Sequence, residues 1–209
     1  GTQGYGPALV RPRDDGVPLT TQDSSCVVLQ MTDMFGSGRE HLVRIANGSV
    51  EVWPSLGFGR FGSRVQLGNA PQFGEDFSID RLFLADIDGS GTVDLLYVHP
   101  DHIDLYMNHS GNAFAEAIAI PLPNTWGPGS KIQFADVRGN GSAALVFSDA
   151  NLPGPLAYDF GSRSKPYLLN RVDNNMGAST HISYQPSTTY ALRDRRDGRG
   201  ADERGAVAH

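Results

Sequence analysis

The sequence has a single cysteine, no excess of basic residues and no long apolar run. One cysteine excludes an intramolecular disulfide, and because Cys26 precedes an apolar run we predict a small buried strand residue rather than a reactive thiol. The net charge of −6 and the pI near 5.4 argue against capture of a nucleic-acid backbone. No apolar stretch approaches the ~20 residues that cross a bilayer, so we expect a soluble chain.

Two further features are missing from the sequence. A basic segment followed by an apolar one is absent from the first residues, so no secretion signal is visible. No stretch of useful length has helical periodicity, so we expect no helix. Turn-forming residues are abundant instead, with 25 Gly and 13 Pro in 209 residues, which is still below the level of a low-complexity chain.

A loop-and-strand pattern occurs three times. Each copy begins with an aspartate and has glycines at its fourth and sixth positions, and each lies between two apolar runs of strand character. The copies start at Asp33, Asp86 and Asp136, which gives spacings of 53 and 50 residues. A period of this size, built from short strands, is typical of β-propeller blades.

We therefore predict an all-β chain that forms a partial propeller of about three four-stranded blades. The Asn47-Gly48 dipeptide predicts a two-residue type I′ hairpin in the first blade, since both turn positions need a positive φ. The C-terminal end of the sequence has mixed charge and no apolar pattern, which predicts disorder there. The predicted segments, in chain order, are a connector over 1–23, blades over about 24–73, 74–124 and 125–172, a β-hairpin extension over 173–190 and a disordered tail over 191–209. Because three blades leave sheet faces and edges open, we expect a longer polypeptide or self-association to complete the ring.

The second loop has the oxygen ligands of a calcium site. Positions 1, 3, 5, 7 and 9 of that loop are Asp86, Asp88, Ser90, the Thr92 carbonyl and Asp94. Three neighbouring carboxylates repel one another unless a cation lies between them. The glutamate that an EF-hand has at position 12 is absent, so the site would be a β-loop variant with a structural Ca²⁺. The alternative is that the aspartates only cap turns.

The other two loops lack this ligand set. At positions 3 and 9 the first loop has Phe35 and His41, and the third has Arg138 and Ala144. We expect both to form the same turn without binding a divalent cation.

Signals for catalysis are weak. No Ser–His–Asp set is identifiable from spacing, and no glycine-rich phosphate loop opens a helix. His99 and His102 flank a predicted hairpin turn, which we interpret as a solvated turn rather than a zinc pair. Trp53, Phe58 and Phe61 are predicted to pack between blades rather than to form a binding surface. We therefore predict that the chain is not an enzyme.

The blade loops resemble FG-GAP/VCBS repeats, the units of integrin-type propellers. Longer stretches resemble the B component of bacterial insecticidal toxin complexes (Tc toxins), which is related to the SpvB family. The resemblance spans about residues 28–194, and its matching stretches are residues 43–62, 69–71, 81–97, 108–112, 165–169 and 174–188.

In that family the B component is a large protein. Its β-propeller docks on a pentameric, channel-forming A component, and together with the C component it forms a shell of Rhs/YD-type repeats around a toxic enzyme. The resemblance implies a non-catalytic propeller segment that acts as docking platform and gate, with the A and C components as partners. It also implies export from the cytoplasm to the extracellular space. The sequence departs from the family at Arg138 and after about Arg195, and it contains no Rhs/YD repeats.

Two other functions stay open at this stage. One is an integrin-like adhesion or carbohydrate-binding propeller, which glycan binding without affinity for an A component would favour. The other is a lyase with Asp and His side chains near the propeller axis. Turnover of a polysaccharide that Asp88→Ala abolishes would favour the lyase.

Overall fold

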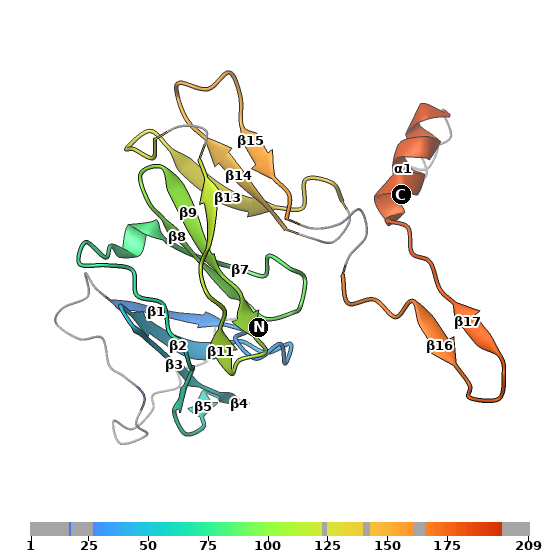
Figure 1. Ribbon diagram of the computed structural model, residues 1–209, viewed down its shortest axis with the longest axis horizontal. Helices are drawn as coiled ribbons and strands as arrows, with labels where there is room; N and C mark the ends of the chain where they lie inside the picture. The colour runs from blue at the N-terminus through green and yellow to red at the C-terminus, as the bar shows by residue number, and fades with distance from the viewer. Residues whose placement is uncertain (1–16, 18–26, 123–124, 140–142, 161–165, 198–209) are drawn as a thin grey trace, which may run out of the picture. The chain divides into compact units, whose positions relative to one another are not determined.

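The computed structural model describes residues 17, 27–122, 125–139, 143–160 and 166–197 (Figure 1). These residues form antiparallel sheets and one short α-helix, so the predicted all-β class is confirmed. The contacts of the chain define two units, one of residues 1–86 and 91–127 and one of residues 87–90 and 128–209. Cys26 and, apart from Val17, the predicted connector over 1–23 lie outside the described residues.

The first sheet has four strands in the order β1-β2-β3-β6. They are β1 (Val27–Thr32), β2 (His41–Ala46), β3 (Ser49–Trp53) and β6 (Val65–Gln66). Ala46 pairs with Ser49, which confirms the predicted two-residue hairpin. The type I′ prediction is wrong, however, because Gly48 has a φ of +73° whereas Asn47 has no positive φ. The Asn47 side chain instead bonds the Phe73 N–H and the Gly74 carbonyl, at 2.6 and 2.9 Å.

The second sheet also has four strands, in the order β12-β9-β8-β7. They are β7 (Leu82–Ala85), β8 (Asp94–Val98), β9 (His102–Tyr106) and β12 (Ile118–Pro121), and the 3₁₀ helix η2 (Ile79–Arg81) precedes them. Two small hairpins accompany the sheets. These pair β4 (Ser55–Gly57) with β5 (Arg60–Phe61), and β10 (Asn108–His109) with β11 (Ala113–Phe114).

One apolar core joins the first two sheets. Its buried side chains come from strands of both sheets and from the loops between them. They are Met34, Val43, Ile45, Val50, Val52, Leu67, Phe73, Leu82, Leu95, Tyr97, Tyr106 and Phe114. Three of its aromatic rings lie close together, since the Phe73 ring is 4.8 Å from that of Tyr97 and 5.9 Å from that of Tyr106. Burial of this apolar surface is what holds the two sheets together.

The third sheet has three described strands, β13 (Lys131–Ala135), β14 (Ala144–Ser148) and β15 (Leu156–Tyr158). The sequence predicts a four-stranded blade over 125–172, but the end of this range does not supply a fourth strand to the third sheet, because β16 (Arg171–Asp173) pairs with β17 (Ser179–His181). The Asn174 carbonyl oxygen Oδ1 accepts from the N–H groups of Met176 and Ala178, and this local turn closes the hairpin early. The hairpin extension therefore runs over 171–181 rather than 173–190.

The helix α1 (Ser187–Arg196) corrects two predictions, that of no helix and that of disorder from residue 191. None of its residues is buried, so it has no apolar stripe for a sequence pattern to reveal. Arg193, Arg195 and Arg196 lie in its last turn, where positive charge interacts favourably with the helix dipole. Residues 198–209 of the predicted tail lie outside the described residues. In the described ranges, no helix combines the length and apolar character of a membrane span.

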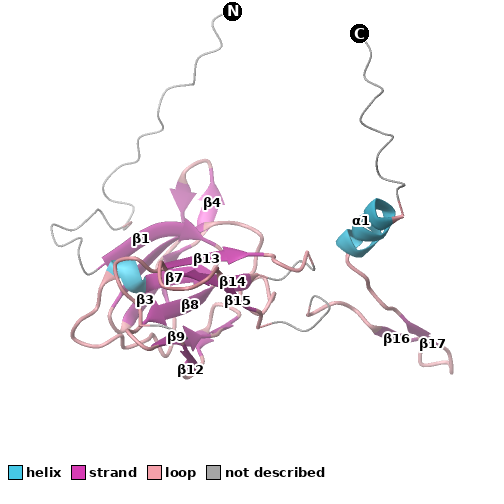
Figure 2. Cartoon of the chain, turned by 90° about the horizontal axis from the view of Figure 1, so that it is seen from above, coloured by secondary structure: helices cyan, strands magenta, loops and turns pink. Residues whose placement is uncertain are grey.

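The three aspartate loops occupy equivalent places in the three sheets. The Asp33 loop joins β1 to β2, the Asp86 loop joins β7 to β8, and the Asp136 loop joins β13 to β14. In each case the two joined strands are antiparallel neighbours. Figure 2 shows strands in magenta and the loops and turns between them in pink. The sequence repeat thus corresponds to a repeat of strand–loop–strand units.

Candidate functional site

The Asp86 loop gathers three carboxylates at the start of β8. One oxygen each from Asp86, Asp88 and Asp94 lies within 4.8 Å of the others. Asp94 is fully buried, with 0% of its surface exposed. The structure therefore brings together the three charged residues of the predicted ligand set.

Each of these carboxylates also accepts a backbone hydrogen bond. The Gly91 N–H lies 3.0 Å from Asp86 Oδ2, and the Ser90 N–H lies 2.9 Å from Asp88 Oδ1. Asp94 Oδ1 accepts from the Asn108 N–H at 2.8 Å. These bonds are the turn-capping role that the sequence left as an alternative. They are compatible with a cation as well, since each carboxylate has about four acceptor positions.

Ser90 and Thr92 also make contacts through atoms other than the predicted ligand oxygens. The Ser90 N–H donates to Asp88, and the buried Thr92 hydroxyl donates to the Asn108 carbonyl at 3.3 Å. Gly89 and Gly91 have φ values of +72° and +89°, which confirms that glycine permits this turn.

A contact that the sequence pattern did not predict lies at the tip of this loop. The Tyr167 hydroxyl donates to Asp88 Oδ2 at 3.0 Å. A Cβ on Gly89 would lie 3.1 Å from the Pro166 ring, so a side chain larger than glycine would crowd the neighbouring segment. The loop tip is thus fixed by a segment nearly eighty residues further along the chain. Only the resemblance over 165–169 pointed to that segment.

In the Asp33 loop the first aspartate caps the turn with hydrogen bonds. Asp33 Oδ1 accepts from the N–H groups of Phe35 and Ser37, both at 3.1 Å, and Oδ2 accepts from that of Gly38 at 2.6 Å. Burial would raise the pKa of Asp33, but these backbone donors outweigh it and lower the pKa below 3.8. No three metal-ligating side chains among the described residues include a member of this loop.

Ser37, His41 and Asp33 come together in the first loop, although their spacing had suggested no such set. The Ser37 hydroxyl lies 3.0 Å from His41 Nε2, and Asp33 Oδ1 lies 3.7 Å from the same nitrogen. However, the Ser55 N–H donates to His41 Nδ1 at 3.0 Å, so in the neutral ring the proton is on Nε2. A general base must instead accept the serine proton at Nε2. This tautomer is therefore that of a structural histidine.

The Asp136 loop is held by different partners. Arg138 at its third position forms an ion pair with Asp159. The Thr188 hydroxyl, from the first turn of α1, donates to the Gly139 carbonyl at 2.7 Å. Residues 140–142 lie outside the described residues.

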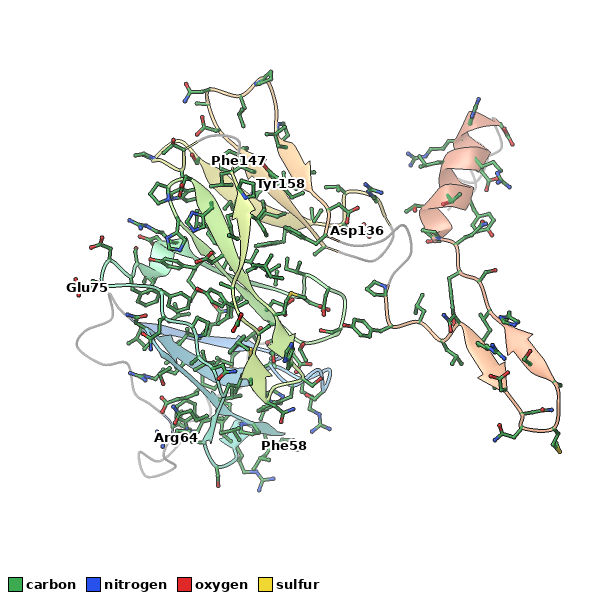
Figure 3. All side chains as sticks on the ribbon, viewed as in Figure 1. Phe58, Arg64, Glu75, Asp136, Phe147 and Tyr158 are labelled. Carbon is green, nitrogen blue, oxygen red and sulfur yellow. The ribbon has the colours of Figure 1, made fainter. Side chains whose placement is uncertain are left out.

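The predicted packing role of the aromatic residues holds for only part of the set. Trp53 is 4% exposed and belongs to the core. Phe58 is 90% exposed at the turn of the β4–β5 hairpin, so its prediction as a residue packed between blades is wrong (Figure 3). Its φ of +52° places it at the hairpin turn, where its side chain has no surface to cover it. Leu56, on β4 of the same hairpin, is 56% exposed.

Comparison with known proteins relates most of the chain to one group. The family model of the insecticide toxin TcdB middle/N-terminal region matches residues 108–204. No curated protein matches the sequence.

Three solved structures carry the comparison further. A chain in the crystal structure of TcdB2-TccC3-Cdc42 is 36% identical over 83% of this chain, with a TM-score of 0.74. A chain in that of TcdB2-TccC3 is 35% identical over 86%, with a TM-score of 0.75. A chain in the Photorhabdus luminescens Tc holotoxin pore is 34% identical over 84%, with a TM-score of 0.73. The present chain spans only 8–9% of the length of these matched chains. Sequence and fold together therefore support a relationship to the B components of Tc toxins.

Proposed function

We propose that this chain is a non-catalytic propeller segment of a Tc-toxin B component, which serves as docking platform and gate in assembly of the toxin complex. The observation that carries the proposal is the 34–36% identity to chains of the TcdB2-TccC3 structures, at TM-scores of 0.74–0.76. Identity at this level extends over more than four fifths of the chain.

The arrangement of the first two sheets supports propeller blades. Blades are stacked side by side, and each buries a face against its neighbour. Here the Val93 N–H donates to the Asp33 carbonyl at 3.0 Å, which links the second aspartate loop to the first. The continuous core across both sheets, with Val43 from one and Leu95 from the other fully buried, fits the same arrangement.

The β4–β5 hairpin supports a docking role. Phe58 and Leu56 expose large apolar surfaces on a short hairpin beside the first sheet. Exposed apolar groups that project from a rigid sheet are typical of protein interfaces, where aromatic anchors contribute most of the affinity. We propose that this hairpin contacts a partner protein in the assembled complex.

The matched structures indicate the kind of partner. They contain TccC3, and one is a Tc holotoxin pore. We therefore propose the channel-forming A component and the C component with its shell as partners, and a secreted complex as the place of function. The neutral tautomer of His41, which leaves Ser37 without a base, supports a segment that does not catalyse a reaction.

We also propose a structural Ca²⁺ at the Asp86 loop. The donor set fits a hard cation, because three carboxylates converge where their charges otherwise repel. Asp86, Asp88 and Asp94 would hold the ion, which would stabilise the loop rather than take part in a reaction.

Co-expression tests the proposed function. The full-length product of the gene that encodes this chain is expressed with a TccC3-type C component, and the complex is analysed by size-exclusion chromatography with light scattering. We expect one complex of defined mass, whose cryo-electron microscopy density contains this segment beside a hollow shell. A full-length product that stays alone, or that binds glycans and no toxin component, would contradict the proposal.

A further inference from the structure

The turn between β8 and β9 brings two histidines and a carboxylate together. A hydrogen bond of 2.8 Å from the His99 N–H to the His102 carbonyl closes the turn. His102 and Asp104 are two residues apart on β9 and therefore lie on the same face of the sheet. One ligand atom each from His99, His102 and Asp104 lies within 4.8 Å of the others. The sequence had suggested only a solvated turn, because the pair of histidines alone gives no third ligand.

Both imidazoles direct a nitrogen at the Asp104 carboxylate. His99 Nε2 lies 3.1 Å from Asp104 Oδ2, and His102 Nε2 lies 3.5 Å from Asp104 Oδ1. The two rings are parallel, with centroids 4.4 Å apart and an interplanar angle of 9°. The three side chains are 18–35% exposed, so an ion and its water ligands can reach them.

Asp101 sets the tautomer of His102. Its Oδ1 lies 2.7 Å from His102 Nδ1, and since a carboxylate only accepts, Nδ1 carries a proton. In a neutral ring Nε2 then has a lone pair, and that lone pair faces the negative Asp104. A lone pair and a carboxylate oxygen that face each other at this distance can both serve as ligands of one metal ion. A carboxylate on the far nitrogen of a histidine is also the usual outer support of a metal ligand.

We propose that His99 Nε2, His102 Nε2 and Asp104 bind one Zn²⁺ or a similar transition-metal ion, with Asp101 as the positioning residue for His102. Two imidazoles and one carboxylate suit Zn²⁺ and not Ca²⁺ or Mg²⁺, which take oxygen ligands. Water completes the coordination. By the same rule His99 Nε2, 3.1 Å from Asp104 Oδ2, carries a proton in the free chain, and binding of the ion displaces this proton. The parallel rings must each turn about χ2 for their nitrogens to meet at one ion, and this torsion is broad in histidine.

The neighbouring tyrosines support the site without acting as ligands. The Tyr106 hydroxyl donates to Asp104 Oδ2 at 3.5 Å. The Tyr97 ring lies edge-on to His99, with centroids 5.1 Å apart. Asp104 is therefore oriented by a donor from its own strand, and His99 by a buried ring.

Zinc titration of the untagged chain tests this site. The chain is freed of metal with a chelator, returned to buffer containing saturating Ca²⁺, and titrated with Zn²⁺ in a calorimeter. We expect one Zn²⁺ per chain. His102→Gln and Asp104→Asn should each weaken binding at least about tenfold, and Asp101→Asn about tenfold through its effect on His102. His109→Gln is the matched control, because His109 is exposed on the separate β10–β11 hairpin, and it should leave the affinity unchanged.

A second readout observes the histidines directly. Zinc should shift the imidazole ¹⁵N resonances of two histidines of the wild-type chain, and His109→Gln should leave both shifted signals in place. Absence of saturable binding would overturn the proposal, and so would unchanged affinity in His102→Gln. Equal weakening by His109→Gln would also overturn it, since this would indicate adventitious binding to surface histidines.

Discussion

The amide of Asn108, on β10, links the Asp86 loop of the second sheet to the Asp33 loop of the first. Its Nδ2 donates to the Met34 carbonyl at 2.9 Å, and these two residues are 74 positions apart in the chain. Nδ2 also lies 3.0 Å from the Val93 carbonyl, while Oδ1 accepts from the Gly111 N–H at 2.8 Å. Since Asn108 is buried, one side chain satisfies three backbone groups that water does not reach.

Asn108→Ala should lower the free energy of unfolding by about 3 kcal/mol, because it leaves buried carbonyl and N–H groups without their partner. Urea unfolding measures this loss. Asn112→Ala, four residues away and exposed, is the control and should stay within about 0.5 kcal/mol of the wild type. Equal stability of the two variants would show that Asn108 does not join the sheets.

Glu51 should stabilise the first sheet through two arginines. Its Oε2 lies 3.0 Å from Arg44 Nη1, and its Oε1 lies 2.6 Å from Arg64 Nη1. Because the carboxylate is buried and the arginines are partly exposed, we expect Glu51→Gln to cost about 1–2 kcal/mol. Glu75→Gln, on an exposed loop, should cost nothing measurable (Figure 3). The difference in stability between the wild type and Glu51→Gln should shrink in molar salt, and thermal unfolding at two salt concentrations checks this.

Acid should destabilise the fold through His41. Burial lowers the pKa of His41 below 6.5, although the charge of Asp33 acts in the opposite direction. The unfolded chain therefore takes up the proton first as the pH falls below 6.5, and stability is lost until the folded His41 is also protonated. Above pH 6.5 this contribution is fully present. Urea unfolding from pH 7.5 to 5.5 should show a smaller slope with pH for His41→Gln than for the wild type.

The Asp33 carboxylate adds a second, more acidic window. Its pKa is lowered, so its contribution to stability is present above pH 3.8 and is lost as the pH falls through the pKa of the folded state.

The His41 prediction is contradicted if His41→Gln and the wild type show the same slope of unfolding free energy with pH between pH 7.5 and 5.5. The buried neutral form of His41 would then not be responsible for the loss of stability in acid.

Calcium should raise the melting temperature of the wild-type chain by mass action. Asp88→Asn keeps an acceptor for the Ser90 N–H but removes a charge from the cluster, so it should abolish the calcium-dependent increase. Asp136→Asn, in a loop whose third position is Arg138, should keep the calcium-dependent increase in melting temperature. Melting curves with Ca²⁺ and with a chelator measure both, and curves that coincide for the wild type would favour the turn-capping role alone.

Phe58→Ser should weaken binding to a partner without changing stability. The side chain is 90% exposed, so its removal leaves the core intact. If the hairpin docks on the partner, we expect a loss of at least about tenfold in affinity, as for an aromatic anchor. Val137→Ser, which changes an exposed apolar residue of the third loop, is the control. Equal affinity of wild type and Phe58→Ser would place the interface elsewhere.

The repeat of aspartate loops was readable from the sequence because its causes are local. Positive-φ glycines, aspartates that cap turns and apolar strands all lie within a few residues of one another, as in the Asp86 loop. The three clustered carboxylates were predicted for the same reason.

Features that depend on long-range register or lack an apolar pattern were missed. Asp104 joins the histidines only because β8 and β9 pair as they do, with Tyr97 opposite Asp104. Asn108 meets Met34 from a distant part of the chain. The helix α1 has no buried face, and the exposed strand β16 gives no alternation of buried and exposed residues that would fix its partner. The prediction that Phe58 packs between blades was wrong, because hydrophobicity alone does not show that this residue lies at the tip of a hairpin.

Binding to the channel is the measurement that tests the central claim most directly. The full-length product, in complex with its C component, is immobilised, and its affinity for a purified Tc A-component pentamer is measured by surface plasmon resonance. The proposed docking role predicts saturable binding of one complex per pentamer that Phe58→Ser weakens. No binding to the pentamer by a folded, assembled complex would contradict it.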